Sequence, residues 1–254
     1  MSALFDPRDL RLNAVGVLGF LVVLAGLAMA FLYAPTDSIQ GHAQRIFYVH
    51  VPMAWLAYLA YGVLFVGCVG YLWKKNPKWD RLARASAELG FLFTTLVLIT
   101  GSLWGRPIWG TWWQWEARLT TTLVLWFIYL GYFMLRSYAG DRERAARHSA
   151  VLGIIGAIDI PIIHQSVEWW RTLHPEPVVL DTTGPNLPDS MLYTLLVSFV
   201  EVHDLLCPIC SGLRYRIEAV RDEIGEPQMT EMFATASQPA DARAQSPVSG
   251  GMED

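Results

Sequence analysis

The stretch WGRPIWGTWWQWEAR, residues 104–118, organises the rest of the chain. It places five tryptophans within twelve positions, between two long apolar runs: Trp104, Trp109, Trp112, Trp113 and Trp115. Pro107 and two glycines interrupt helical geometry, so we expect the whole stretch to be a loop rather than a helix. An indole has an apolar body and one N–H donor, which suits a membrane surface. An aromatic belt explains one or two tryptophans, but five beside Arg106 and Arg118 exceed what a belt needs.

The composition indicates a membrane protein. Hydrophobic residues make up 53% of the 254 residues and charged residues only 17%, whereas soluble domains carry about a quarter charged residues. Several apolar runs are long enough to cross a bilayer, which predicts an all-α, polytopic integral membrane protein of about six transmembrane helices within residues 1–216. The predicted spans are 14–33, 46–73, 85–103, 119–135, 150–167 and a sixth from residue 191.

The first and last of these spans leave alternatives open. Ala28-Met-Ala30 resembles a signal-peptidase site, but the apolar run continues past it, so we interpret it as an uncleaved span. In the sixth span, Glu201 and Asp204 interrupt the apolar run, and each charge near a helix centre costs about 2.5–3.5 kcal/mol on insertion scales. A local sequence anomaly and a shortened, irregular span both explain this. Residues 217–254 have the composition of a disordered tail.

The basic residues predict how the spans are oriented. Residues 74–84 and 136–148 are predicted as basic loops, and with a cytoplasmic N-terminus all but four of the 19 lysines and arginines fall on the cytoplasmic side, as the positive-inside rule requires. Both termini are then cytoplasmic. The four outer arginines lie near the tryptophans and two histidines: Arg45, Arg106, Arg118 and Arg171. Because a guanidinium pairs naturally with a carboxylate, they indicate an anionic ligand.

Two of the histidines on this outer side, His50 and His174, lie next to arginine and aromatic residues. Imidazole is the usual axial ligand where a protein binds haem iron through nitrogen. Two imidazoles on opposite sides of a flat, apolar macrocycle would hold it with its edge toward the indoles. The alternative is two ordinary interfacial histidines. Of the others, we interpret His148 as solvated, His42 as solvated or accessory, and His164 as a hydrogen-bonded structural residue.

The tryptophan stretch also carries a resemblance to a known family. WGRPIWGTWWQWEARLT resembles the "WWD" motif of bacterial haem-handling proteins, and the length and span count resemble the CcmC family of the cytochrome c maturation (System I) pathway. The resemblance runs from about Arg11 to Leu195. The family's usual Asp is Glu116 here, with the same charge and one more methylene. We expect Glu116 to orient an arginine or a tryptophan N–H rather than to act as an acid or base.

The resemblance implies which residues bind the ligand. FYVHVP and EWWRTLH match the positions of the family's two external haem-ligand histidines, which implies His50 and His174 as axial ligands of haem b. The five tryptophans would provide a stacking surface, and the four outer arginines are candidates for contacts with the haem propionates. A second external loop, 168–189, would form the opposing lip with Trp169 and Trp170.

The resemblance further implies a haem-transfer component of the bacterial inner membrane rather than an enzyme. We expect it to bind haem at the periplasmic surface and to present one edge to a periplasmic haem chaperone. Whether it promotes covalent haem attachment to that chaperone stays open. Its implied partners are the membrane and ATPase subunits of an ABC transporter and a small single-span membrane subunit, with no nucleic acid. The chain has no GxxxxGK[ST] motif, so it should not hydrolyse ATP itself.

Two other functions remain alternatives. A cytochrome c synthase (haem lyase) module would catalyse thioether formation, but such relatives are longer and carry extra histidines within spans. A haem-containing electron-transfer subunit with quinone chemistry would need histidine pairs within spans, and His164 alone does not provide them. Asp159, in the fifth span, is a proton-relay or packing candidate. Cys207 and Cys210, with His203 nearby, are a weak metal or redox candidate.

Overall fold

The structure is a computed structural model of the full chain, and the part that it describes consists of helices joined by short non-helical segments. Every regular element in that part is a helix, which confirms the predicted all-α class. The residues described are 7–139, 141–170, 172–174, 179, 184, 186–201, 217 and 220, with side chains described from residue 17 onward. Apart from residues 217 and 220, the predicted tail lies outside them, as do Cys207, Cys210 and His203.

Four helical segments are long and apolar enough to cross a membrane. They are the turn η3 (His42–Ile46) with α2 (Phe47–Lys74), then α3 (Pro77–Trp109), α4 (Ala117–Tyr138), and α5 (Arg142–Ile155) continuing through η4 (Gly156–Ile158) into α6 (Asp159–Trp169). Before them, α1 (Pro7–Ala28) and the π-helical turn η2 (Met29–Tyr33) form a shorter apolar helix. Residues 189–201 are helical too. The polytopic architecture is therefore confirmed, while the sixth span stays a prediction beyond residue 201.

The turn between α2 and α3 is much tighter than the basic loop that we predicted. Lys75 adopts the left-handed conformation with φ of 53° and closes α2. Asn76 then caps α3 by accepting a hydrogen bond from the backbone N–H of Lys78 at 3.0 Å, and Pro77 occupies the first helical position, where its missing N–H costs nothing. Span three therefore begins at Pro77 rather than at residue 85, and the charged residues after it belong to the helix.

A buried ion pair joins three helices at this basic end of the bundle. Arg136 on α4 donates to both carboxylate oxygens of Asp80 on α3, at 2.6 and 2.7 Å, and to Ser149 on α5 at 3.1 Å. Since both charged side chains are about nine-tenths buried, the pair needs this bidentate geometry to offset desolvation. Arg136 and Arg142 were predicted to lie in a loop, but α4 extends through Tyr138 and α5 begins at Arg142.

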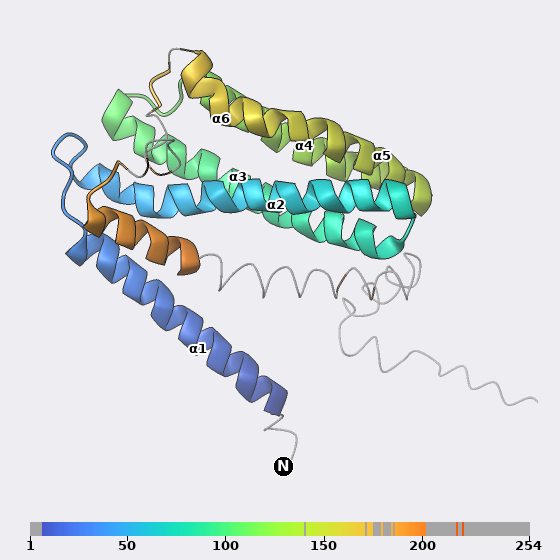
Figure 1. The fold of residues 1–254 in the computed structure, drawn as a ribbon, viewed down its shortest axis with the longest axis horizontal. Helices are drawn as coiled ribbons and strands as arrows, with labels where there is room; N and C mark the ends of the chain where they lie inside the picture. The colour runs from blue at the N-terminus through green and yellow to red at the C-terminus, as the bar shows by residue number, and fades with distance from the viewer. Residues whose placement is uncertain are drawn as a thin grey trace, which may run out of the picture.

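Small residues let the helices approach closely in the core. A Cβ on Gly67 of α2 would lie 2.9 Å from the backbone nitrogen of Ala83 on α3, so only glycine fits there. Cys68 is fully buried and faces Gly153 on α5, which confirms its interpretation as a small core residue. Figure 1 shows the resulting antiparallel arrangement of α2, α3 and α4.

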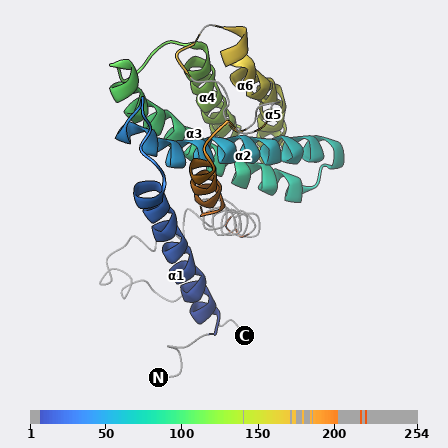
Figure 2. The same ribbon diagram turned by 60° about the vertical axis from the view of Figure 1, so that its left-hand side comes forward.

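Helix α1 diverges from the other helices (Figures 1 and 2). It meets them near its end, where Gly26 faces the side chain of Glu201 on the 189–201 helix. Glu201 is buried there. A charged residue in an apolar helix is tolerated when it is buried against protein rather than exposed to lipid, and Glu201 meets this condition.

Candidate ligand-binding site

The tryptophan stretch is divided between a helix and a loop. α3 continues through Pro107 and ends at Trp109, so our prediction of a loop is wrong for residues 104–109. A proline removes one hydrogen bond to the preceding turn, and this close to a helix end the loss is tolerated. Gly110 closes the helix with φ of 76°, and its N–H donates to the carbonyl oxygen of Arg106 at 3.1 Å, a left-handed cap that glycine favours. The loop is therefore limited to residues 110–116.

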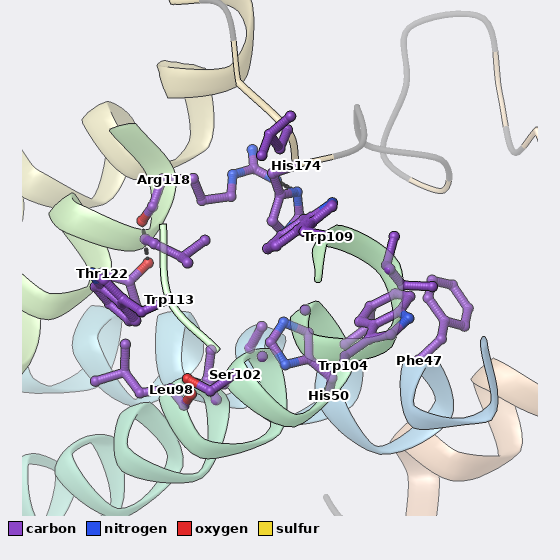
Figure 3. A pocket seen from close by; sticks show the side chains of 18 of the residues that line it. Phe47, His50, Leu98, Ser102, Trp104, Trp109, Trp113, Arg118, Thr122 and His174 are labelled. Atoms are coloured by element: carbon purple, nitrogen blue, oxygen red, sulfur yellow. Dashed lines mark hydrogen bonds between the residues drawn. The ribbon is translucent and has the colours of Figure 1, made fainter. Parts of the chain in front are cut away.

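A cavity of about 330 Å³ lies where four helix ends meet, at the end of the bundle opposite the Asp80–Arg136 pair. The beginning of α2, the end of α3, the beginning of α4 and the segment after α6 surround it, as Figure 3 shows. Its lining is mostly apolar and aromatic. Among the residues predicted to bind the ligand, six line it: His50, His174, Trp104, Trp109, Trp113 and Arg118.

His50 lies on the first turn of α2 and is 8% exposed. Its Nδ1 is 2.9 Å from the hydroxyl oxygen of Thr100 on α3, and its ring packs edge-on against Trp104 with centroids 5.7 Å apart. Gly101 makes room for the imidazole, since a Cβ there would lie 3.2 Å from His50 Cε1. One face of α3 thus holds the ring of His50 at the cavity wall.

His174 follows α6 and is held by two residues near the start of α4. Its backbone N–H donates to Glu116 Oε2 at 3.3 Å, and its Nδ1 lies 3.4 Å from Nη1 of Arg118. Glu116 therefore orients the backbone of His174, a partner that we did not predict. Arg118 also donates to the carbonyl oxygens of Ile163 at 3.3 Å and His164 at 2.8 Å, so it ties α4 to the end of α6.

The other predicted tryptophans lie outside the cavity. Trp112 and Trp115 are 57% and 76% exposed and line a shallow apolar hollow next to the cavity. Trp169 and Trp170 are more than half exposed and pack edge-on against each other, with centroids 5.8 Å apart. These four indoles are placed for contacts at the surface.

Of the other three outer arginines, the structure describes Arg45 and Arg106, and neither lines the cavity. Arg45 donates to the carbonyl oxygen of Ala30 and lies over the ring of Phe31. Arg106 donates to the carbonyl oxygen of Gly110 and lies over the ring of Trp112. Arg171 lies outside the described residues. Within the described part of the chain, Arg118 is the arginine that reaches the cavity.

Several cavity residues were not predicted from the sequence. Gln40 accepts a hydrogen bond from Trp104 Nε1 at 3.0 Å and fixes that indole, and Tyr58 and Thr122 also line the cavity. His164, interpreted as structural, lines it too. Thr100, which contacts His50, was not predicted either; its only sequence signal is a weak one, its position four residues before Trp104 on the same helix face.

Comparison with known proteins finds relatives across the helical region. Residues 7–230 match the family CcmC, heme exporter protein C. Heme exporter protein C of Bradyrhizobium diazoefficiens is 48% identical over 164 residues, which is 65% of this chain and 62% of that protein. The protein of the same name from Haemophilus influenzae is 38% identical over 213 residues, 83% of this chain and 85% of that protein. That of Escherichia coli K12 is 43% identical over 162 residues, 63% of this chain and 65% of that protein. The matches to the Bradyrhizobium and Escherichia proteins thus span less than two thirds of their length.

Proposed function

The chain belongs to the CcmC family of heme exporter proteins, and from this we propose that it binds haem b at the periplasmic membrane surface. It then presents the haem to a periplasmic haem chaperone for cytochrome c maturation. The family assignment supports a haem-export role as a multi-pass membrane protein. The residues that hold the haem, the presentation step and the partners are our proposal.

One observation carries the proposal: His50 and His174 line the same cavity although they are far apart in the sequence. Haem supplies an iron with two axial positions, a flat apolar macrocycle and two carboxylates. His50 and His174 would be the axial ligands. Trp104, Trp109 and Trp113 provide an aromatic lining for the macrocycle.

The residues present fit such a ligand in two further respects. Nε1 of Trp113 is buried without a hydrogen-bond partner in the described residues, and a buried polar group of this kind usually has a partner in the complete complex. Arg118 at the cavity wall is matched to a carboxylate, with which a guanidinium forms charge-assisted hydrogen bonds. The cavity volume lies at the lower end for small-molecule pockets, about 300–1,000 Å³, which suits a ligand held with one edge outside.

The exposed indoles Trp112 and Trp115 line a hollow that borders the cavity, since Leu98, Ser102 and Trp113 line both. We propose that the chaperone contacts the haem edge there, and that an ABC transporter and a small single-span subunit bind elsewhere on the protein. In this proposal the protein lies in the bacterial inner membrane with both termini in the cytoplasm. It holds and releases haem, and covalent chemistry is left to its partners.

Replacing either histidine tests the proposal. In His50→Ala and His174→Ala we expect the purified protein to lose most of its haem, as measured by absorption spectra, and to stop loading the chaperone. His148→Ala is the matched control, because His148 is exposed on α5 at the other end of the bundle. If both cavity variants keep a wild-type spectrum and still load the chaperone, the ligand assignment is wrong.

A further inference from the structure

The hydroxyl of Thr100 lies between a backbone carbonyl oxygen and the ring of His50. Thr100 Oγ1 lies 2.7 Å from the carbonyl oxygen of Leu96 and 2.9 Å from His50 Nδ1. A carbonyl oxygen can only accept, so the single hydroxyl proton of Thr100 is donated to Leu96. The oxygen of Thr100 must then accept from His50, which places the proton of the neutral imidazole on Nδ1. His50 Nε2 is left as a base with an available lone pair.

Arg118 imposes the opposite arrangement on His174. Its Nη1 lies 3.4 Å from His174 Nδ1, and a guanidinium has donors only. Nδ1 of His174 therefore accepts, and the proton of the neutral ring lies on Nε2. A metal needs a ring nitrogen with a free lone pair. While Arg118 stays in this position, neither nitrogen of His174 is available, because one is hydrogen-bonded and the other is protonated.

We propose that the two imidazoles are not equivalent: Thr100 holds His50 ready to bind iron, and Arg118 withholds His174 until its guanidinium moves away. This inference rests on the proposed haem-binding function. In this proposal Thr100 is a positioning residue. Arg118 links recognition of the ligand's carboxylates to the binding of its iron by His174. Figure 3 shows Arg118 and His174 adjacent on one side of the cavity and His50 on another.

The carboxylates of the ligand provide a reason for Arg118 to move. A guanidinium and a carboxylate form paired charge-assisted hydrogen bonds between opposite charges, whereas a neutral imidazole offers the guanidinium one acceptor nitrogen and no charge, so Arg118 leaves His174 Nδ1 when a carboxylate is within reach. His174 then gives up its Nε2 proton to water and takes one from water at Nδ1, with no net change in charge. His174 Nε2 becomes available only for a ligand that carries carboxylates, which gives the site selectivity for haem with free propionates.

Nitrogen-15 NMR of the full-length, haem-free protein with ¹⁵N-labelled histidine tests the tautomers directly. We expect the signals that disappear in His50→Ala to be those of an Nδ1–H ring, and those that disappear in His174→Ala to be those of an Nε2–H ring. Thr100→Val should shift His50 away from the Nδ1–H form, and Thr100→Ser should restore it. The same tautomer for both rings in the wild type would overturn the inference. This measurement needs no haem, so it is independent of the proposed function.

Haem and its dimethyl ester, which lacks free carboxylates, test the role of Arg118. With haem, we expect a six-coordinate low-spin spectrum, and with the ester a five-coordinate high-spin spectrum. Arg118→Ala should have opposite effects on the two: weaker retention of haem, but a six-coordinate spectrum with the ester. Arg106→Ala, which removes an arginine that does not line the cavity, should behave like the wild type. Six-coordinate spectra with both ligands in the wild type would overturn the gating role, whereas binding of neither would contradict the proposed function instead.

Thr100 should also affect how tightly haem is held. Replacing a residue that orients a metal ligand commonly costs about 10–100-fold in affinity, so we expect a loss in this range for Thr100→Val. Thr100→Ser keeps the hydroxyl and should bind nearly as the wild type does. Equal haem affinity in both variants would remove Thr100 from the positioning role.

Discussion

A single carboxylate, that of Glu116, connects the start of α4 with the backbone of His174. His174 belongs to no helix, so its position depends on the contacts of its own backbone and side chain. Glu116 Oε1 is buried without a hydrogen-bond partner in the described residues, which leaves one oxygen free for a further donor. Glu116 therefore acts on the ligand site through the placement of an imidazole.

Glu116→Ala should weaken haem binding because the backbone N–H of His174 loses its hydrogen-bond acceptor. We expect a loss of about 10–100-fold in affinity, as for other residues that support a metal ligand. Glu116→Asp, which keeps the carboxylate on a shorter side chain, should retain most of the affinity. Titration of haem into the purified variants measures both. Equal affinities in the alanine variant and the wild type would show that Glu116 does not position His174.

The chemistry of the site was easier to predict than the contacts that orient it. Histidines, arginines and clustered tryptophans are informative because few structural roles need them together, and six of the predicted residues do line one cavity. Thr100 gave no comparable signal. A threonine in an apolar helix ordinarily bonds to its own preceding turn, as Thr94 and Thr95 do. Only the packing of α3 against α2 shows that Thr100 also meets His50.

At the scale of the elements, the site depends on how closely α2 and α3 pack. His50 is on α2, while Thr100, Gly101 and Trp104 are on α3, so a small separation of these helices would take the imidazole away from its partners. Gly67 maintains the close approach, because any side chain there would meet the backbone of Ala83.

Gly67→Leu should destabilise the protein and loosen haem binding together. Overpacking of a tight core typically costs about 1–3 kcal/mol, and here the neighbour is backbone that cannot rotate aside. Gly62→Ala, on the same helix, is the control: a Cβ there meets nothing within 4 Å, and alanine favours the helix by up to about 1 kcal/mol. Thermal unfolding in detergent should show a lower midpoint for the first variant only. A lower midpoint in both, or in neither, would contradict this view of the interface.

The sequence patterns predicted where the helices lie better than where they begin and end. The apolar runs predicted the helices correctly, but α3 extends past both predicted ends of its span. At one end, the basic residues predict a loop, although Asn76 and Pro77 form a good helix start. At the other end, Pro107 and the tryptophans predict a loop, although the helix continues to Trp109. A proline near a helix end removes only one backbone hydrogen bond. The helix ends instead at Gly110, which has a positive φ.

On the scale of the whole molecule, the buried ion pair and the ligand cavity lie at opposite ends of the bundle. The buried Asp80–Arg136 pair joins α3, α4 and α5 at one end, and the cavity lies at the other. The basic residues at the beginning of α3 (Lys78, Arg81 and Arg84) and those of α5 (Arg142, Arg144 and Arg147) belong to the end that carries the ion pair. On the proposed orientation, this end faces the cytoplasm and the cavity opens toward the periplasm.

Asp80→Asn should therefore destabilise the protein without changing the haem spectrum of the folded fraction. Breaking a buried pair by removing one charge costs about 3–5 kcal/mol. The control is Glu143→Gln, which breaks the exposed pair with Arg147 and should cost no more than about 0.5 kcal/mol. Denaturant unfolding and absorption spectra of the same samples check both expectations. An altered spectrum in folded Asp80→Asn protein would show that the two ends are coupled.

The central claim is that His50 and His174 bind the same iron. Near-infrared magnetic circular dichroism of the ferric haem complex tests it most directly, because it identifies both axial ligands. We expect the signature of two histidines in the wild type and its loss in both His50→Ala and His174→Ala. A wild-type signature other than that of two histidines, or a two-histidine signature that persists in either variant, would contradict the claim.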